Sequence, residues 1–161
     1  VRDGNRNLLL ELQSLVTDSE NEFTQRVCVG VNSNRLKMIT AILKKHGKQG
    51  LRHDIYISLV GGLKLAETDT SADVALAASL VSSLNDKPLP KDMLWLGEMS
   101  LSGEVRPVNG GVQRAQEAIK HGFKHIVIPQ ANYHPKMESD GVKITKVRSI
   151  LDVVNLVLNF S

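Results

Sequence analysis

Thr68-Asp69-Thr70-Ser71-Ala72-Asp73 is the stretch from which the fold of this chain can be worked out. It follows an alternating apolar segment that ends at Gly61-Gly62, and it precedes apolar residues at helical spacing over residues 71–84. The pattern predicts a strand, a sharp turn and a helix that begins near a serine. A second helix is predicted to start at Gly110-Gly111, which would bring the cation of Arg114 toward that serine.

The composition is that of an ordinary protein with an aliphatic core. The chain has 161 residues, of which 42% are hydrophobic and only 4% aromatic, with a net charge of +3. This length suits a single domain over residues 1–161. No apolar run approaches the ~20 residues of a membrane span, and no signal peptide is recognisable. The first residue is Val1, from which we expect a fragment of a longer protein. Cys28 is the sole cysteine, so a reducing compartment is expected.

The apolar patterns along the chain predict one α/β domain of the α+β type, with a mixed sheet and packed helices. Residues 8–16 and 23–31 are predicted to be neighbouring antiparallel strands, and residues 100–108 a hairpin that turns at Ser102-Gly103. Residues 93–99 are expected to form a buried central strand. Further strands are expected at 54–60, 123–129 and 142–147, and helices after Asn32-Ser33-Asn34 and at 71–84, 110–122 and 149–160.

A basic run between residues 35 and 53 is the main candidate for contact with a polyanion, because it contains no acidic residue. Part of it has a structural explanation, since cations near a helix end complement the helix dipole. A solvated helix face and a DNA-facing patch are both consistent with the pattern. The cations of the run are Arg35, Lys37, Lys44, Lys45, Lys48 and Arg52.

Ser71 is the candidate for chemistry. In the structural interpretation, the Thr70 or Ser71 side chain caps a helix and Asp73 occupies its first turn, where a negative charge is favourable. In the functional interpretation, Ser71 is a nucleophile beside backbone N–H groups that would stabilise an oxyanion. Neither a phosphate-binding loop nor a dinucleotide fingerprint is present, and the histidines lack the spacing of a metal site.

The order of elements from Gly61 to Pro129 resembles the proteolytic domain of the Lon family. Ser71-Ala72 matches the serine of that family, and Gly97-Glu98 matches the segment that follows its helix. The ungapped match places Arg114 where the family has its catalytic lysine. A guanidinium cannot serve as the general base of a Ser–Lys dyad, so Ser71 and Arg114 are expected to be vestigial. Substitute amines that do not match the motif are Lys64, Lys87, Lys91 and Lys120.

A closer resemblance, which extends over nearly the whole chain, is to the C-terminal Lon-like domain of the RadA (Sms) family of bacterial DNA repair proteins. Several motifs in one order carry it, which makes the match more specific than any single motif. The matching stretches are Leu8-Leu9-Leu10-Glu11-Leu12-Gln13-Ser14-Leu15-Val16, Val29-Gly30-Val31-Asn32-Ser33-Asn34-Arg35-Leu36, Asp54-Ile55-Tyr56-Ile57-Ser58-Leu59-Val60-Gly61-Gly62, Thr70-Ser71-Ala72-Asp73, Ser83-Leu84-Asn85-Asp86-Lys87-Pro88-Leu89-Pro90, Leu96-Gly97-Glu98, Gly103-Glu104-Val105-Arg106-Pro107-Val108 and His121-Gly122-Phe123-Lys124.

This resemblance implies a non-proteolytic scaffold, oligomerisation and DNA-contact domain of an ATP-dependent helicase that acts in recombination and branch migration. It implies a cytoplasmic bacterial protein that assembles into a ring, expected to be a hexamer, on single-stranded DNA. The family's ATP, magnesium and zinc sites lie in other domains, so no cofactor or metal is expected within residues 1–161. The alternatives are an active Ser–Lys peptidase and an oligomerisation module that does not contact DNA.

Overall fold

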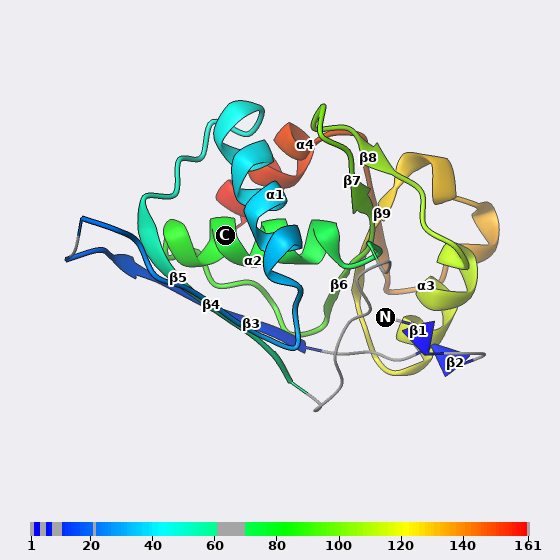
Figure 1. The fold of residues 1–161 in the computed structure, drawn as a ribbon. Coiled ribbons are helices and arrows are strands. Elements are labelled where there is room, and N and C mark those ends of the chain that lie inside the picture. The colour runs from blue at the N-terminus through cyan, green and yellow to red at the C-terminus, as the bar shows by residue number, and fades with distance from the viewer. Residues whose placement is uncertain (1, 4–5, 8–10, 21, 61–69, 161) are drawn as a thin grey trace.

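Two three-stranded sheets and four α-helices form the framework of the part of the chain that is described (Figure 1). The computed structural model describes residues 2–3, 6–7, 11–20, 22–60 and 70–160. The turn expected at Gly61-Gly62 and the start of the strand expected at residues 8–16 lie outside these ranges. Two short ribbons complete the sheets, one of which pairs β1 (Arg2–Asp3) with β2 (Arg6–Asn7).

The first sheet has the order β3-β5-β4. The central strand β5 (His53–Val60) is antiparallel to β3 (Glu11–Asp18) and parallel to β4 (Arg26–Val29). The expected pairing of the first two of these strands with each other is therefore wrong, because β5 lies between them. The helix that follows β4 carries the chain across the sheet, and such a crossover returns the next strand parallel to the one it left.

The crossover helix is α1 (Ser33–Lys45), which agrees with the helix predicted after Asn32. The Asn32 side chain accepts hydrogen bonds from the backbone N–H groups of Asn34 at 2.8 Å and Arg35 at 3.2 Å. This cap satisfies two of the N–H groups that a helix start leaves without a helical partner. The predicted apolar stripe is buried in the core and consists of Leu36, Ile39, Ile42 and Leu43.

The second sheet is parallel throughout and has the order β10-β9-β6. Its central strand is β9 (His125–Pro129), every residue of which is buried, and β10 (Lys143–Val147) lies on one side. The expected central strand over residues 93–99 is wrong in two respects. The chain leaves the sheet after β6 (Met93–Trp95), which is an edge strand, and a separate strand β7 (Glu98–Met99) follows Gly97. Gly97 has a φ of +148°, which non-glycine residues rarely adopt.

The remaining elements pack around the two sheets. The predicted hairpin is confirmed: β7 pairs with β8 (Val105–Arg106) across a turn in which Gly103 has a φ of +84°. Helix α2 (Asp73–Leu84) packs against α1, α4 and β3, and α3 (Gly111–Lys120) covers the second sheet beside two 3₁₀ turns at Gln130–Asn132 and Pro135–Met137. Helix α4 (Ile150–Leu158) begins with a capping box between Ser149 and Asp152.

The α/β architecture with mixed strand pairing is confirmed by this arrangement. The largest hydrophobic cluster lies between the first sheet and helices α1, α2 and α4, and it is aliphatic as the composition predicts. Within the described residues, no helix combines the length and the apolar character needed to cross a bilayer.

Candidate functional site

The start of α2 is joined by backbone hydrogen bonds to the segment that contains Gly97. The Gly97 N–H donates to the Ser71 carbonyl at 3.1 Å, and the Val74 N–H donates to the Gly97 carbonyl at 3.1 Å. Ala72 is the N-cap residue, and its side chain makes no capping hydrogen bond. The prediction that Thr70 or Ser71 is the N-cap residue is therefore wrong. The close approach of Gly97 holds the helix start in its place.

Two N–H groups that follow Ser71 along the chain already have acceptors within the fold. The Asp73 N–H donates to the Thr70 carbonyl at 3.1 Å, and the Val74 N–H is bound to Gly97. An oxyanion site requires N–H groups that point at the developing charge and have no other acceptor. These two N–H groups are already engaged within the fold. Ser71 itself is buried, with 6% of its surface exposed.

Asp73 ties together three elements beneath this junction. Its carboxylate accepts from the Arg35 Nε at 3.2 Å and also forms an ion pair with the second nitrogen of that guanidinium. The same carboxylate accepts the Met99 N–H at 2.9 Å. Burial raises the pKa of Asp73, while its bonds to Met99 and Arg35 act in the opposite direction. Asp73 therefore links α1, α2 and β7 through charge-assisted hydrogen bonds.

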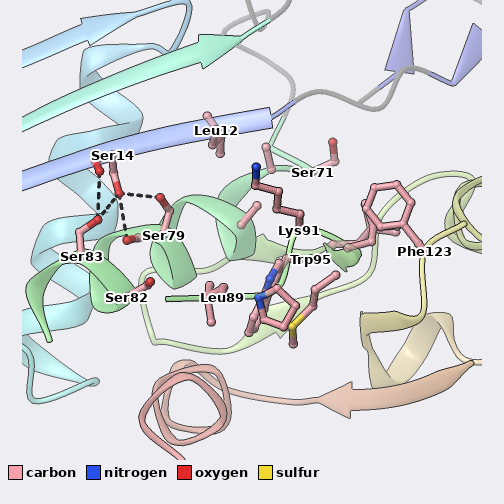
Figure 2. Close-up of a pocket in the computed structure, with 16 residues that line it drawn as sticks. Leu12, Ser14, Ser71, Ser79, Ser82, Ser83, Leu89, Lys91, Trp95 and Phe123 are labelled. Atoms are coloured by element: carbon pink, nitrogen blue, oxygen red, sulfur yellow. Dashed lines mark hydrogen bonds between the residues drawn. The ribbon is translucent and has the colours of Figure 1, made fainter. Parts of the chain in front are cut away.

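A cavity of about 460 Å³ lies between β3, α2 and β6, with Ser71 at one end (Figure 2). Trp95 and Phe123 contribute apolar surface to it. Away from Ser71, the Ser14 hydroxyl lies 2.6 Å from the Ser79 hydroxyl and 2.7 Å from that of Ser83. These serines bond to one another and join strand β3 to helix α2. Their role is to hold the wall of the cavity.

Arg114 and four substitute lysines were considered as partners of Ser71. Lys64 lies outside the described residues, and Lys87 and Lys120 are exposed and do not line the cavity. Lys91 lines the same cavity as Ser71, and its side chain is exposed at the surface. Arg114 lies on α3 with 5% of its surface exposed, and it is not among the described residues that line the cavity. The catalytic amine of a Ser–Lys dyad needs a dry environment to lose its proton near neutral pH. The exposed position of Lys91 does not provide one.

The basic run divides into one engaged cation and five exposed ones. Arg35 forms the ion pair with Asp73, and its side chain is 17% exposed. The other five are exposed, and none of them takes part in an ion pair with any residue that the structure describes. Three lie on α1 and two on the loop that leads to β5. We call these five residues the basic surface: Lys37, Lys44, Lys45, Lys48 and Arg52.

The pairing of Arg35 with Asp73 was missed in the sequence because the two residues are 38 positions apart. The sequence contained a weak signal for this pair. Arg35 directly precedes the apolar stripe of α1, and Asp73 directly precedes the apolar stripe of α2. Such positions border the core, where a charge requires a partner. The serine cluster gave a similar signal, because Ser79, Ser82 and Ser83 are the only polar residues of α2 after Asp73.

Comparison with known proteins finds a matching family model and several sequence relatives. A family model described as subunit ChlI of Mg-chelatase matches residues 25–132. The chain is 43% identical over 157 residues to the DNA repair protein RadA of Escherichia coli strain K12, an alignment that covers 97% of this chain and 34% of that protein. The RadA protein of Haemophilus influenzae is 40% identical over 158 residues, with 98% of this chain and 34% of that protein covered. The RadA protein of Pseudomonas aeruginosa is 42% identical over 156 residues, with 94% and 34% covered.

These relatives confirm the resemblance to the RadA family that the motifs indicated. The chain spans about a third of the length of the curated relatives it matches. What the remaining two thirds of those proteins contribute is not part of this similarity.

Proposed function

We infer the function of this chain from one premise: it belongs to the family described as subunit ChlI of Mg-chelatase, and nearly all of it aligns with one third of the DNA repair proteins named RadA. We propose that it is a non-proteolytic scaffold and DNA-contact domain that serves DNA repair. The observation that carries this proposal is the basic surface, whose five cations are exposed and form no ion pair with any residue that the structure describes.

The basic surface suits the backbone of a nucleic acid. Lys37 and Lys44 are seven residues apart on α1, which puts them on the same side of the helix, and Lys45 lies beside Lys44. Free lysines and arginines bind phosphates without regard to sequence and release counterions as they do so. The proposed ligand is single-stranded DNA, bound through its phosphates.

The polar groups at the start of α2 support a structural role for that region. Asp73 is bound by Arg35 and Met99, and the N–H groups of Asp73 and Val74 have acceptors inside the fold. A nucleophilic serine needs a base and free oxyanion donors. We therefore propose that Ser71 belongs to a scaffold that resembles the Lon fold and that it performs no hydrolysis.

The proposal extends to the protein of which this chain would be a part. By analogy with the RadA family, ATP and magnesium would bind to an ATPase domain and zinc to a finger, both outside residues 1–161. The chain would contribute to a ring-shaped homo-oligomer, expected to be a hexamer, that acts as a helicase in recombination and branch migration. Such a protein would work in the bacterial cytoplasm.

Fluorescence anisotropy with a labelled single strand tests the DNA contact. The proposal predicts binding whose logarithmic affinity falls linearly with the logarithm of the salt concentration, with a slope of about −0.7 for each phosphate neutralised. Five cations on the basic surface set an upper bound of about −3.5 for the slope. Binding that is absent at low salt, or that does not respond to salt, contradicts the DNA role of this chain.

The competing function is a Ser–Lys peptidase of the Lon type, and one observation favours it: Lys91 and Ser71 line the same cavity. A fluorophosphonate probe, which labels activated serines, separates the two functions. We expect no labelling of the wild-type chain. Labelling that disappears in both Ser71→Ala and Lys91→Met would establish the peptidase, whereas loss in Ser71→Ala alone would point to a different base.

A further inference from the structure

Strand β6 has one edge with which no other strand pairs in the described part of the chain. It is an outer strand of its sheet, and its strand partner there is β9. In a strand, the N–H and C=O of one residue point to the same side, and those of the next residue point to the opposite side. An outer strand therefore presents the backbone groups of alternate residues to whatever lies beside it.

The hydrogen bonds around the end of β6 show which residues present these groups. The Leu96 N–H donates to a carbonyl of β9 at 2.9 Å, whereas the Gly97 N–H donates at 3.1 Å to the Ser71 carbonyl on the opposite side. By alternation, the N–H and C=O groups of Trp95 and Met93 point away from β9. No hydrogen bond joins these groups to another residue in the part of the chain that the structure describes.

The cavity of about 460 Å³ that reaches Ser71 extends along this edge. Its lining includes Met93, Leu94 and Trp95, which are the three residues of β6. Consecutive side chains of a strand point to opposite faces of the sheet, so a space that touches all three lies beside the strand and not over one face. Three residues of a strand span about 10 Å. We call this space the β6 slot, because it runs the length of that strand.

The β6 slot is apolar along most of its length and has a positive charge at its border. Leu89, Trp95 and Phe123 line it (Figure 2). Lys91 is the only charged residue among the described residues that line it, and its side chain is exposed. The acidic neighbour of Lys91 in the sequence, Asp92, is not among the lining residues. A ligand that fills the slot therefore needs apolar groups inside it and a negative charge at the surface.

We propose that the β6 slot is the docking site for an extended peptide segment of a partner protein, in which apolar and acidic residues alternate. The peptide would bond through its backbone to Met93 and Trp95 as an additional strand, which is a recurring mode of peptide recognition. Its apolar side chains would contact Leu89 and Phe123. The alternate, acidic side chains would point the other way, toward the solvent and Lys91.

An extended peptide suits this edge better than a small planar ligand does. A peptide repeats its N–H and C=O groups at the spacing of a strand, so it can bond to Met93 and Trp95 at once. A nucleobase could meet the backbone at only one of these places. DNA is disfavoured as well, because the slot offers a single cation for its phosphates.

This inference goes beyond the proposed function and does not depend on it. No residue of the basic surface lines the β6 slot, so DNA binding and peptide binding can fail separately. Docking of a peptide also requires neither a nucleophile nor a general base. It is therefore compatible with the proposal that Ser71 performs no hydrolysis.

Trp95 provides a direct readout, because it is the only tryptophan of the chain and lines the β6 slot. The probe is a short blocked peptide of alternating leucine and aspartate, added to the unmodified protein. We expect a saturable change in the emission of Trp95 with a Kd below about 1 mM. The same peptide methylated at its backbone nitrogens keeps its side chains but loses its N–H donors. It should bind at least about tenfold more weakly.

Charge reversal at Lys91 tests the contact with the acidic side chains. Lys91→Glu should weaken binding of the aspartate peptide about fivefold and strengthen binding of a peptide that has lysine in place of aspartate. The matched control, Lys87→Glu, makes the same change at an exposed lysine that does not line the slot and should bind like the wild type. An exchange of preference between the two peptides cannot arise from a loss of folding.

The inference is overturned if the emission of Trp95 does not respond to the aspartate peptide up to about 1 mM. It is equally overturned if the methylated peptide binds as tightly as the unmodified one, or if Lys87→Glu and Lys91→Glu change binding to the same extent. A response to adenosine monophosphate without a response to the peptide would assign the slot to a nucleotide and refute the docking role. Cleavage of the peptide, detected by mass spectrometry, would establish the competing peptidase function and also refute it.

Discussion

The start of α2 and the solvent side of α1 both carry charged residues, but the charge at the start of α2 is buried and bound within the fold, whereas those on α1 are exposed. At the start of α2, Asp73 is buried and bound by Arg35 and Met99. On α1, Lys44 and Lys45 are exposed and have no acidic partner in the described part of the chain. Arg35 and Lys44 belong to the same helix and the same basic run, yet only Lys44 is available to a ligand.

The difference teaches which polar groups can take part in function. A buried charge must be compensated within the fold, so its hydrogen-bonding atoms are already occupied when a ligand approaches. An exposed cation gains little from surface ion pairs and costs little to leave unpaired. In this molecule the carboxylate of Asp73 at the start of α2 is bound within the fold, whereas the cations of the basic surface are exposed.

The largest effect on stability is expected from Gly97→Ala, which disrupts the close backbone contact between Gly97 and the start of α2. A Cβ at this position would lie 2.6 Å from Cγ2 of Val74 and 3.0 Å from Cγ1 of Val105, on a backbone with a φ of +148°. Steric overlap and backbone strain together should cost about 4 kcal/mol of the free energy of unfolding. Urea unfolding followed by circular dichroism measures it. A loss under about 1 kcal/mol would mean that the junction is not tightly packed.

The difference between the two regions is tested by replacing two cations with methionine: the one bound to Asp73 and one from the basic surface. Arg35→Met leaves the Asp73 carboxylate buried without its ion pair and should lower the free energy of unfolding by about 3 kcal/mol. Lys44→Met removes an exposed charge and should change it by less than about 0.5 kcal/mol. The two variants are compared by urea midpoints in one buffer. Equal effects would show that Arg35 is no more engaged in the fold than Lys44.

A smaller effect is expected from His125, a buried residue at the start of β9. Its Nε2 lies 2.7 Å from the Thr145 hydroxyl, and burial lowers its pKa below the ordinary 6.5, an effect to which Lys143 adds and which Asp92 opposes. Below pH 6.5 the unfolded chain binds a proton that the folded chain does not, so stability falls as the pH falls.

His125→Gln removes this titration, so the stability of the wild type relative to this variant should decline as the pH is lowered from about 7.5 to 5. Thermal unfolding at several pH values measures the difference between the two proteins. A difference that stays constant across this range would mean that His125 titrates alike in the folded and unfolded chains.

Local patterns were enough to predict the helices and the hairpin. The Asn32 cap, the stripe from Leu36 to Leu43 and the turn at Gly103 depend on residues within a few positions of one another, where spacing and backbone preference decide the outcome. The order of strands could not be predicted in this way. Two alternating segments in succession favour a hairpin, and only the path of α1 across the sheet shows that β5 lies between them.

The candidate site shows the same limit. The burial of Ser71 and Arg114 could not be inferred from their residue types, and the pairing of Arg35 with Asp73 depends on two helices that meet in space. The sequence also gave no indication that the Val74 N–H would be bound by Gly97. That the basic surface binds DNA, and that Ser71 is inactive, remain predictions.

The most direct test of the account reverses charge on the basic surface and measures binding to single-stranded DNA across a salt series. Lys44→Glu with Lys45→Glu should make the dependence of affinity on salt shallower by about 1.4, because each lost phosphate contact contributes about 0.7 to the slope. Lys120→Glu with Lys124→Glu changes the net charge equally at exposed lysines elsewhere and should leave the slope unchanged. The same slope for the wild type and for the Lys44 and Lys45 variant would contradict the account.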